Sequence, residues 1–173
     1  SVTVAESQTT ICLNGLSENQ DGIELKDSDY NVISGNGHQG IWLSDSGGDQ
    51  IFNNRIGVDQ TGTESITNDW DGLTLTNETH HTVIGSGSMS VLRNTISGNS
   101  SCGVRIDGGS NNITLQGNYI GLGESDGMLK IPNELAGVCI FDAVSIALSY
   151  SSDIVNQYIS ANYREGVYAS NTA

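Results

Sequence analysis

A short phrase recurs along this chain: a glycine, an apolar residue, any residue, and a second apolar residue. It is written GIEL, GIWL, GLTL, GVRI, GVCI and GVYA, beginning at Gly22, Gly40, Gly72, Gly103, Gly137 and Gly166. The first step is short, and every later step is close to thirty residues. A repeat of about that length cannot bury its apolar face alone, so successive copies must stack on one another. The chain is therefore predicted to be a solenoid.

A longer unit of two coils, each coil being one circuit of the solenoid, repeats more regularly. YNVISGNGHQGIWL, RNTISGNSSCGVRI and NQYISANYREGVYA place Asn31, Asn94 and Gln157 at two equal intervals. Between them, NNRIGVDQTGT and GNYIGLGESDG place Asn54 and Asn118 at almost the same interval. Two types of coil therefore alternate, and the amide side chains at these positions are predicted to stack or to cap turns.

Apolar and polar residues alternate within each phrase, as in Ile41, Trp42 and Leu43, and this is the period of a β-strand. The spacing of a helical repeat is missing, and even residues 135–150 alternate. We predict an all-β fold, a right-handed parallel β-helix (β-solenoid) of about five to six coils, with no α-helix longer than two turns. The glycine before each strand is expected at a corner with positive φ. One inward-facing column is predicted, made of Ile23, Leu25, Ile41, Leu43, Leu73, Leu75, Val104, Ile106, Val138 and Ile140.

The composition is that of an acidic, turn-rich domain. Twenty acidic and six basic residues give a formal charge of −14, which disfavours nucleic acids and anionic membrane surfaces as partners. No apolar run is long enough to span a membrane. We predict a single domain over residues 1–173, with repeats over about 11–170 and residues 1–10 as an edge strand or linker. Those first residues lack the features of a signal peptide, so any such signal would be cleaved already or lie outside this fragment.

The three cysteines, Cys12, Cys102 and Cys139, are odd in number and far apart, and none belongs to a CxxC pair. This spacing argues against a zinc site or a redox motif. All three are expected to be free thiols.

The phrases NVISGNGHQGIWL, NNRIGVDQTGT and RNTISGNSSCGVRI resemble the right-handed parallel β-helix repeats of bacterial secreted and surface proteins, the pectin-lyase-like superfold. The resemblance covers roughly residues 11–170. It implies an extracellular or cell-surface location, and a group that contains polysaccharide lyases, hydrolases, epimerases, adhesins and inert spacers. The short step from Gly22 to Gly40 departs from the pattern and indicates a shortened first coil.

The GHG and RIK motifs of the pectin hydrolases are not intact in this sequence. The leading interpretation is therefore a non-catalytic extracellular structural or adhesive module, such as a fibre or surface-layer subunit. The alternative is a carbohydrate-active domain of the lyase, hydrolase or epimerase kind, or a carbohydrate-binding domain. Expected partners are carbohydrate, further β-helix coils of a longer chain, or other copies stacked end to end, with the strand of residues 2–5 completing a neighbour's sheet.

Two residues are weak candidates for catalysis. His38 lies in GHQG and is the only acid–base candidate of its coil, although a solvated corner residue is the simpler interpretation. Arg105 is predicted to face outward, stacked between Thr74 and Cys139 of the neighbouring coils. His80 and His81 have no companion at a metal-ligand spacing, so no transition-metal site is expected.

Acids follow several of the repeated strands, and stacking would bring them into a loose column. They are Asp27, Asp45, Asp107 and Asp142, with Asn77 at the equivalent position of another coil. Neighbouring carboxylates in such a column would repel one another, and calcium would relieve the repulsion. Calcium at these acids and a solvated acidic face are both consistent with the pattern; no other cofactor is expected.

Three sequons could carry glycans in a secreted setting, at Asn77 (NET), Asn99 (NSS) and Asn112 (NIT). In a chain so rich in Asn, Ser and Thr, such triplets also arise by chance.

Overall fold

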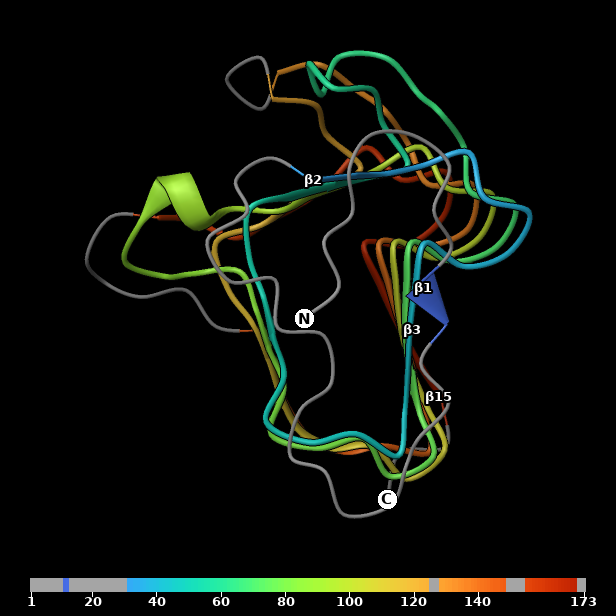
Figure 1. Cartoon of the computed structure of the whole chain (residues 1–173), viewed down its shortest axis with the longest axis vertical. Helices are drawn as coiled ribbons and strands as arrows, with labels where there is room; N and C mark the ends of the chain where they lie inside the picture. Colours follow the sequence, from blue (N-terminus) through green and yellow to red (C-terminus); the bar gives the residue numbers. More distant parts are fainter. Residues whose placement is uncertain (1–10, 13–30, 125–127, 149–154, 171–173) are drawn as a thin grey trace.

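The computed structural model describes residues 11–12, 31–124, 128–148 and 155–170, and these wind into a right-handed parallel β-helix (Figure 1). All pairings between named strands are parallel. The only helix in the described ranges is a 3₁₀ turn at Ser90–Leu92. The predicted all-β parallel β-helix is confirmed, and the described residues form about four coils where about five to six were predicted for the whole chain. In the described part of the chain, no helix has the length and apolar character needed to cross a membrane.

Three sheets run along the solenoid. Sheet A contains β1 (Ile11–Cys12), β3 (Ile41–Ser44), β6 (Leu73–Thr76), β9 (Val104–Ile106), β12 (Val138–Phe141) and β15 (Val167–Ser170). Sheet B contains β4 (Gln50–Ile51), β7 (Val83–Ile84), β10 (Asn111–Leu115) and β13 (Val144–Leu148). Sheet C contains β2 (Asn31–Ile33), β5 (Asn54–Ile56), β8 (Thr95–Ile96), β11 (Tyr119–Ile120) and β14 (Tyr158–Ile159). The strand order gives four complete coils from β3 to β14, with β1 and β2 before them and β15 after them.

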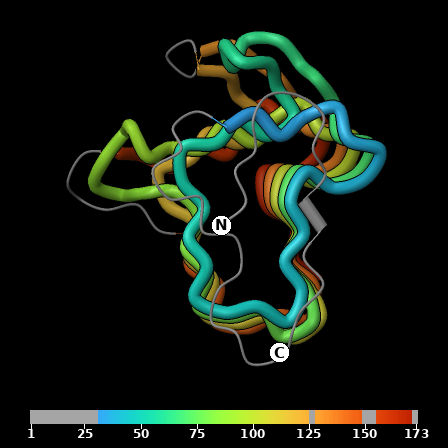
Figure 2. The backbone as a smooth tube through the Cα atoms, viewed as in Figure 1, coloured from blue at the N-terminus to red at the C-terminus, as the bar shows by residue number. Residues whose placement is uncertain are grey.

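Successive coils superimpose along the axis, and longer loops leave the stack at its periphery (Figure 2). Two of these loops touch each other, because the backbone N–H of Glu124 donates to the carbonyl of Gly62 at 3.0 Å. The coil of β5 and the coil of β11 carry these loops, so the alternation of two coil types is confirmed.

The interior is a column of aliphatic side chains. Ile41, Leu73, Val104 and Val138 lie in register along sheet A, and the residues two positions later form a second row. All of the predicted column from Ile41 to Ile140 is buried. Ile23 and Leu25 lie outside the described residues. Each fully buried aliphatic side chain contributes roughly 1.5–3 kcal/mol, so this column supplies much of the folding free energy.

The first strand of sheet A is β1, which pairs Ile11 with Ile41. The step along the chain from Ile11 to Ile41 is close to the step from Ile41 to its next partner, Leu73. Strand β3 therefore has both of its neighbours at ordinary coil spacing, and the prediction of a shortened first coil is corrected.

The repeat glycines have a different role from the one predicted. Positive φ angles occur at corner glycines such as Gly57 and Gly85, but not at Gly72 or Gly103. A Cβ on Gly72 would lie 2.7 Å from the carbonyl oxygen of Gly103 and 2.7 Å from Nδ2 of Asn99. Glycine is needed before β3, β6, β9 and β12 because the next coil approaches Gly40, Gly72, Gly103 and Gly137 too closely for any side chain.

Two ladders of amide side chains run along the corners. The B–C ladder, between sheets B and C, joins Asn31, Asn54, Asn94, Asn118 and Gln157 through side-chain hydrogen bonds of 2.9–3.1 Å. It confirms that the repeated amides stack. The C–A ladder, between sheets C and A, joins Asn36, Asn68, Asn99, Asn133 and Asn162 at 2.8–2.9 Å and was not predicted. Its signal was present, because an asparagine stands four positions before each repeat glycine from Gly40 onward.

The expectation of three free thiols is wrong for two of them. Cys102 and Cys139 form a disulfide between adjacent coils, with their Cα atoms 6.1 Å apart and both residues fully buried. Their sequence separation of 37 is one coil and a few residues more, so stacking brings the two cysteines together although no sequence motif pairs them. Cys12 lies in β1.

Candidate functional site

A hollow of about 510 Å³ lies on the outer face of sheet A, over β3, β6 and β9. Its lining combines two tryptophans, one arginine, three aspartates and four uncharged polar residues. They are Gln39, Trp42, Asp69, Trp70, Asp71, Thr74, Thr76, Ser101, Arg105 and Asp107. We call this the sheet A groove.

Strand register builds its floor. Trp42, Thr74 and Arg105 are direct neighbours on β3, β6 and β9, and Cys139 follows on β12. Because side chains alternate along a strand, these residues point away from the core formed by their neighbours on either side. The predicted position of Arg105 between Thr74 and Cys139 is confirmed.

The loops that enter sheet A build one wall. His38 and Trp70 each stand two positions before a repeat glycine, so stacking of the coils brings their rings together. The rings lie 4.4 Å apart between centroids with an angle of 21° between their planes, and Trp70 is 51% exposed. His38 thus supports the exposed indole from behind, and its Nδ1 is also 2.9 Å from Oε1 of Gln39.

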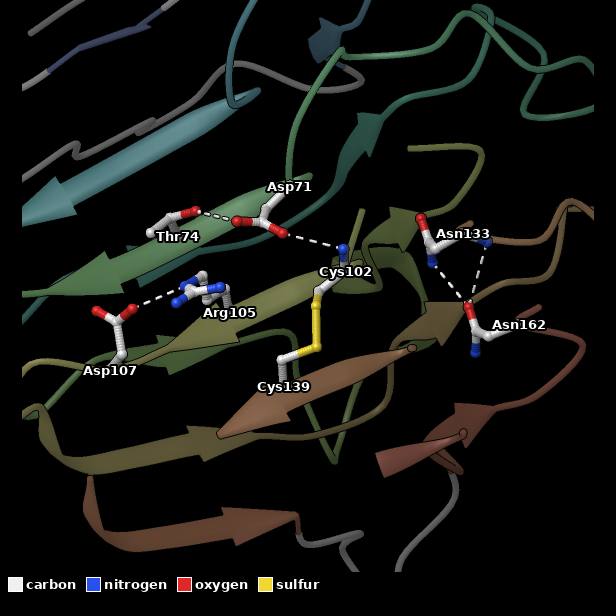
Figure 3. The surroundings of a disulfide bond; sticks show 8 residues. All are labelled: Asp71, Thr74, Cys102, Arg105, Asp107, Asn133, Cys139 and Asn162. Atoms are coloured by element: carbon white, nitrogen blue, oxygen red, sulfur yellow. Dashed lines mark hydrogen bonds and ion pairs between the residues drawn. A yellow bond between two sulfur atoms is a disulfide. The ribbon is translucent and has the colours of Figure 1, made fainter. Parts of the chain in front are cut away.

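Asp71 is a structural residue of the wall (Figure 3). Its Oδ2 accepts from the hydroxyl of Thr74 at 3.1 Å and its Oδ1 accepts from the backbone N–H of Cys102 at 2.9 Å. Both oxygens are therefore used to fasten the loop before β6 to its own strand and to the next coil. Cys102 also forms the disulfide with Cys139, so the residue that Asp71 holds is tied to the following coil as well.

Arg105 is held by its neighbours as well (Figure 3). Its Nε donates to Oδ2 of Asp107 at 2.7 Å, and its guanidinium lies 4.7 Å from the ring centre of Phe141. The side chain is 36% exposed, so the pair itself contributes little to stability. It does set the orientation and the charge of the groove floor.

The indole of Trp42 is part of this floor. Its Nε1 is buried and has no hydrogen-bond partner among the described residues. A buried N–H without an acceptor costs about 1–3 kcal/mol. A donor that the protein leaves unused in the lining of a groove is the kind of group that a polar ligand or an ordered water satisfies.

The acids considered for calcium do not gather in one place. Asp45 and Asp142 occupy one corner column, in which Asn77 and Gly108 stand between them, and all four have positive φ of 44–60°. Three strand spacings separate the two acids, or about 14 Å. Asp107 lies one position earlier, beside Arg105, and Asp27 lies outside the described residues. A left-handed corner conformation, which Asp, Asn and Gly tolerate, accounts for the repeated residue types.

The three sequons differ in exposure. Asn99 is fully buried in the C–A ladder, where its Nδ2 donates to Oδ1 of Asn133, so the folded coil leaves no room for a glycan there. Asn77 and Asn112 are exposed. Their amides donate to Ser44 Oγ and to Asn111 Oδ1, both at 2.9 Å.

Sequence reasoning named Arg105 and His38 as weak catalytic candidates; Arg105 lines the groove and His38 contacts its wall at Trp70, and their catalytic role stays a prediction. It did not name the tryptophans or Asp71. A signal existed for each tryptophan. Trp42 is a large aromatic residue at an outward strand position, where the neighbouring coils carry Cys12 and Thr74, and Trp70 stands at the same coil position as His38. Only the coil register shows that these positions border one groove.

Comparison with known proteins gives one match. A family model described as Periplasmic copper-binding protein (NosD) matches residues 1–78. No curated protein and no solved structure matches the chain. The chain is a right-handed parallel β-helix repeat protein, and its N-terminal part is similar to a periplasmic family.

The described residues do not fit a copper site. Copper in proteins is bound mainly by His, Cys and Met side chains. Among the residues that the structure describes, no three of His, Cys, Asp and Glu gather where they could share a metal ion. His80 and His81 meet edge to face at 5.2 Å, and Cys102 and Cys139 are closed in the disulfide.

Proposed function

We propose that this chain is a rigid extracytoplasmic adhesive module, which binds a saccharide in the sheet A groove without transforming it. The observation that carries the proposal is the groove itself, with Trp42 in its floor, half-exposed Trp70 on its wall, and polar side chains between them. Aromatic faces with a few placed polar groups are the usual composition of a small-ligand site. The stacked coils hold the groove rigid, which lowers the entropy cost of binding.

The disulfide and the matched family support a location outside the cytoplasm. Disulfides persist in the periplasm and in extracellular space and are rare in the cytosol. The Cys102–Cys139 bond is fully buried and joins two coils. The family that matches residues 1–78 is described as periplasmic.

The bonding of two of the three groove acids, Asp71 and Asp107, favours binding over catalysis. Both carboxylate oxygens of Asp71 accept hydrogen bonds from the protein, and Asp107 is paired with Arg105. A general acid or base needs a free proton position within reach of the substrate. The competing function is a lyase-like activity with Arg105 on the outer face of the sheet. Release of unsaturated or reducing sugar from polysaccharides, abolished by Arg105→Ala, would establish that activity instead.

Binding is tested by titration calorimetry of the folded chain against a panel of oligosaccharides. Trp70→Ala should weaken binding about tenfold or more, because burying an aromatic face contributes on the order of 1.5–3 kcal/mol. Tyr163→Ala is the matched control, since Tyr163 is 78% exposed and does not line the groove. Failure of every saccharide to bind, with a normal melting curve, would refute the proposal.

Self-assembly is a second proposal, and it starts from the edge strands. In the described residues, β13, β14 and β15 each pair on one side only. Nε2 of Gln157, at this end of the B–C ladder, is buried without a partner there. Such an edge pairs with strands of another copy or with further coils of a longer chain, and we propose the first for the chain of residues 1–173. Light scattering should show association that rises with concentration, whereas a monomer at every concentration would contradict it. The strand of residues 2–5, expected to complete a neighbour's sheet, lies outside the described residues.

A further inference from the structure

We infer that the ligand of the sheet A groove is an uncharged saccharide rather than a uronate. This inference deepens the proposed function and rests on it. Its basis is the negative formal charge of the groove and the bond that already joins Arg105, the one base in the groove lining, to Asp107.

The groove is acidic. Its lining contains three carboxylates, Asp69, Asp71 and Asp107, and one base, Arg105, so one positive and three negative charges give a formal charge of −2. The chain as a whole carries −14. At 4 Å, two like charges repel by about 1 kcal/mol in water and about 4 kcal/mol near a protein surface. A ligand with a carboxylate on each sugar would meet this repulsion at every residue.

Arg105 does not offset that repulsion. Its Nε is bonded to Asp107 at 2.7 Å, and its guanidinium lies 4.7 Å from the Phe141 ring. Carboxylate recognition by arginine depends on a fork of free N–H donors. In this protein the Nε side of the Arg105 guanidinium already binds the Asp107 carboxylate. The groove lining contains no second Lys or Arg.

The remaining groups suit hydroxyls and apolar sugar faces. Thr76 and Ser101 offer hydroxyls, and exposed Asp69 offers acceptor oxygens to hydroxyl donors. The negative face of an indole favours the weakly positive C–H groups of an uncharged ring over an anion. Trp70 presents such a face, half-exposed and backed by His38.

The test compares neutral and acidic oligosaccharides of equal length. Hexamers of β-1,4-linked glucose, mannose and galactose are titrated beside hexamers of galacturonate and mannuronate at pH 8. We expect binding in the neutral set alone, with affinity that changes less than about twofold between low and high salt. Tighter binding of a uronate hexamer, weakened by salt, would overturn the inference while leaving the proposed function standing. Absence of binding in both sets would overturn both.

The variant Asp107→Asn provides a second, independent test of the inference. It removes one negative charge and frees Arg105, so uronate affinity should rise about tenfold or more from one charge-assisted hydrogen bond. A melting curve and near-ultraviolet circular dichroism verify the fold of the variant. If uronate affinity does not rise in the folded variant, the charge argument is wrong.

Discussion

The side chains of Asn99 and Asn133 are linked from one coil to the next: Nδ2 of Asn99 donates to Oδ1 of Asn133 at 2.8 Å, and both residues are completely buried. Neither residue can lose its amide without leaving partners unsatisfied, because the backbone N–H of Asn99 also donates to Oδ1 of Asn133 at 3.1 Å. The ladder therefore performs at a corner the task that strand pairing performs within a sheet.

Asn99→Ala should lower the free energy of unfolding by about 2–4 kcal/mol, because it empties buried space and leaves Oδ1 of Asn133 and the Ser97 carbonyl with fewer donors. Urea denaturation measures the change. Asn156→Ala is the matched control, since Asn156 is an exposed asparagine without a positive φ and should shift stability by less than about 0.5 kcal/mol. Equal effects of the two variants would contradict the role given to the ladder.

Gly72→Ala should destabilise the fold by about 1–3 kcal/mol or more, because the added Cβ would lie 2.7 Å from the Gly103 carbonyl oxygen. Gly37→Ala serves as the comparison, since its Cβ would meet only Oδ2 of Asp69 at 3.9 Å. Thermal melting of both variants distinguishes them. A Gly72→Ala protein as stable as the parent would show that the coils can separate locally at no cost.

The double change Cys102→Ser and Cys139→Ser removes the disulfide. It should lower the free energy of unfolding by about 4 kcal/mol, because the bond closes a loop with a sequence separation of 37. Thiol titration of the denatured chain should find two more thiols after reduction than before it. Because Asp71 accepts from the Cys102 N–H, the variant should also weaken saccharide binding in the sheet A groove. Unchanged thiol counts would refute the pairing.

Asp59 gives the protein an acid-sensitive loop. Burial raises the pKa of Asp59, but hydrogen bonds from the Thr61 hydroxyl and from the backbones of Glu64, Thr63 and Thr61 outweigh it and lower the pKa from 3.8 to about 2. A lowered pKa stabilises the fold above about pH 4, and that contribution is lost as pH falls through 2. After allowance for solvent screening it is about 1 kcal/mol. Asp59→Asn should therefore lower stability at pH 6 and flatten its change between pH 4 and pH 2, as measured by urea denaturation.

The sequence left open both calcium and a solvated acidic face at the corner acids, and a chelator distinguishes the two. Because Asp45 and Asp142 stand three spacings apart in their column, we expect EDTA to leave the melting temperature unchanged. With free calcium at about one hundred times the dissociation constant, a bound site would add about 2.7 kcal/mol to the free energy of unfolding. It would raise the melting temperature by several degrees. A fall of that size, blunted in Asp45→Asn, would establish calcium binding at this column.

The sequence by itself determined the architecture. The repeat glycines, the alternation in phrases such as Ile41-Trp42-Leu43, and amides at matched intervals were enough to predict a parallel β-helix, its inward column and the B–C ladder. These features are local and periodic, so stacking alone turns each of them into a contact. The position of Arg105 between Thr74 and Cys139 followed from the same periodicity.

Only the tertiary structure decided the contacts that depend on the exact stagger and closeness of neighbouring coils. It joined Cys102 to Cys139, which do not occupy the same coil position, and it brought the next coil against Gly72. It also placed Trp70 over His38 and bound Arg105 to Asp107, and these contacts shape the groove. Periodicity in the sequence shows which positions stack, but it does not encode the closeness of neighbouring coils or the side-chain conformations that make these contacts, because local backbone geometry and loops of unequal length set them.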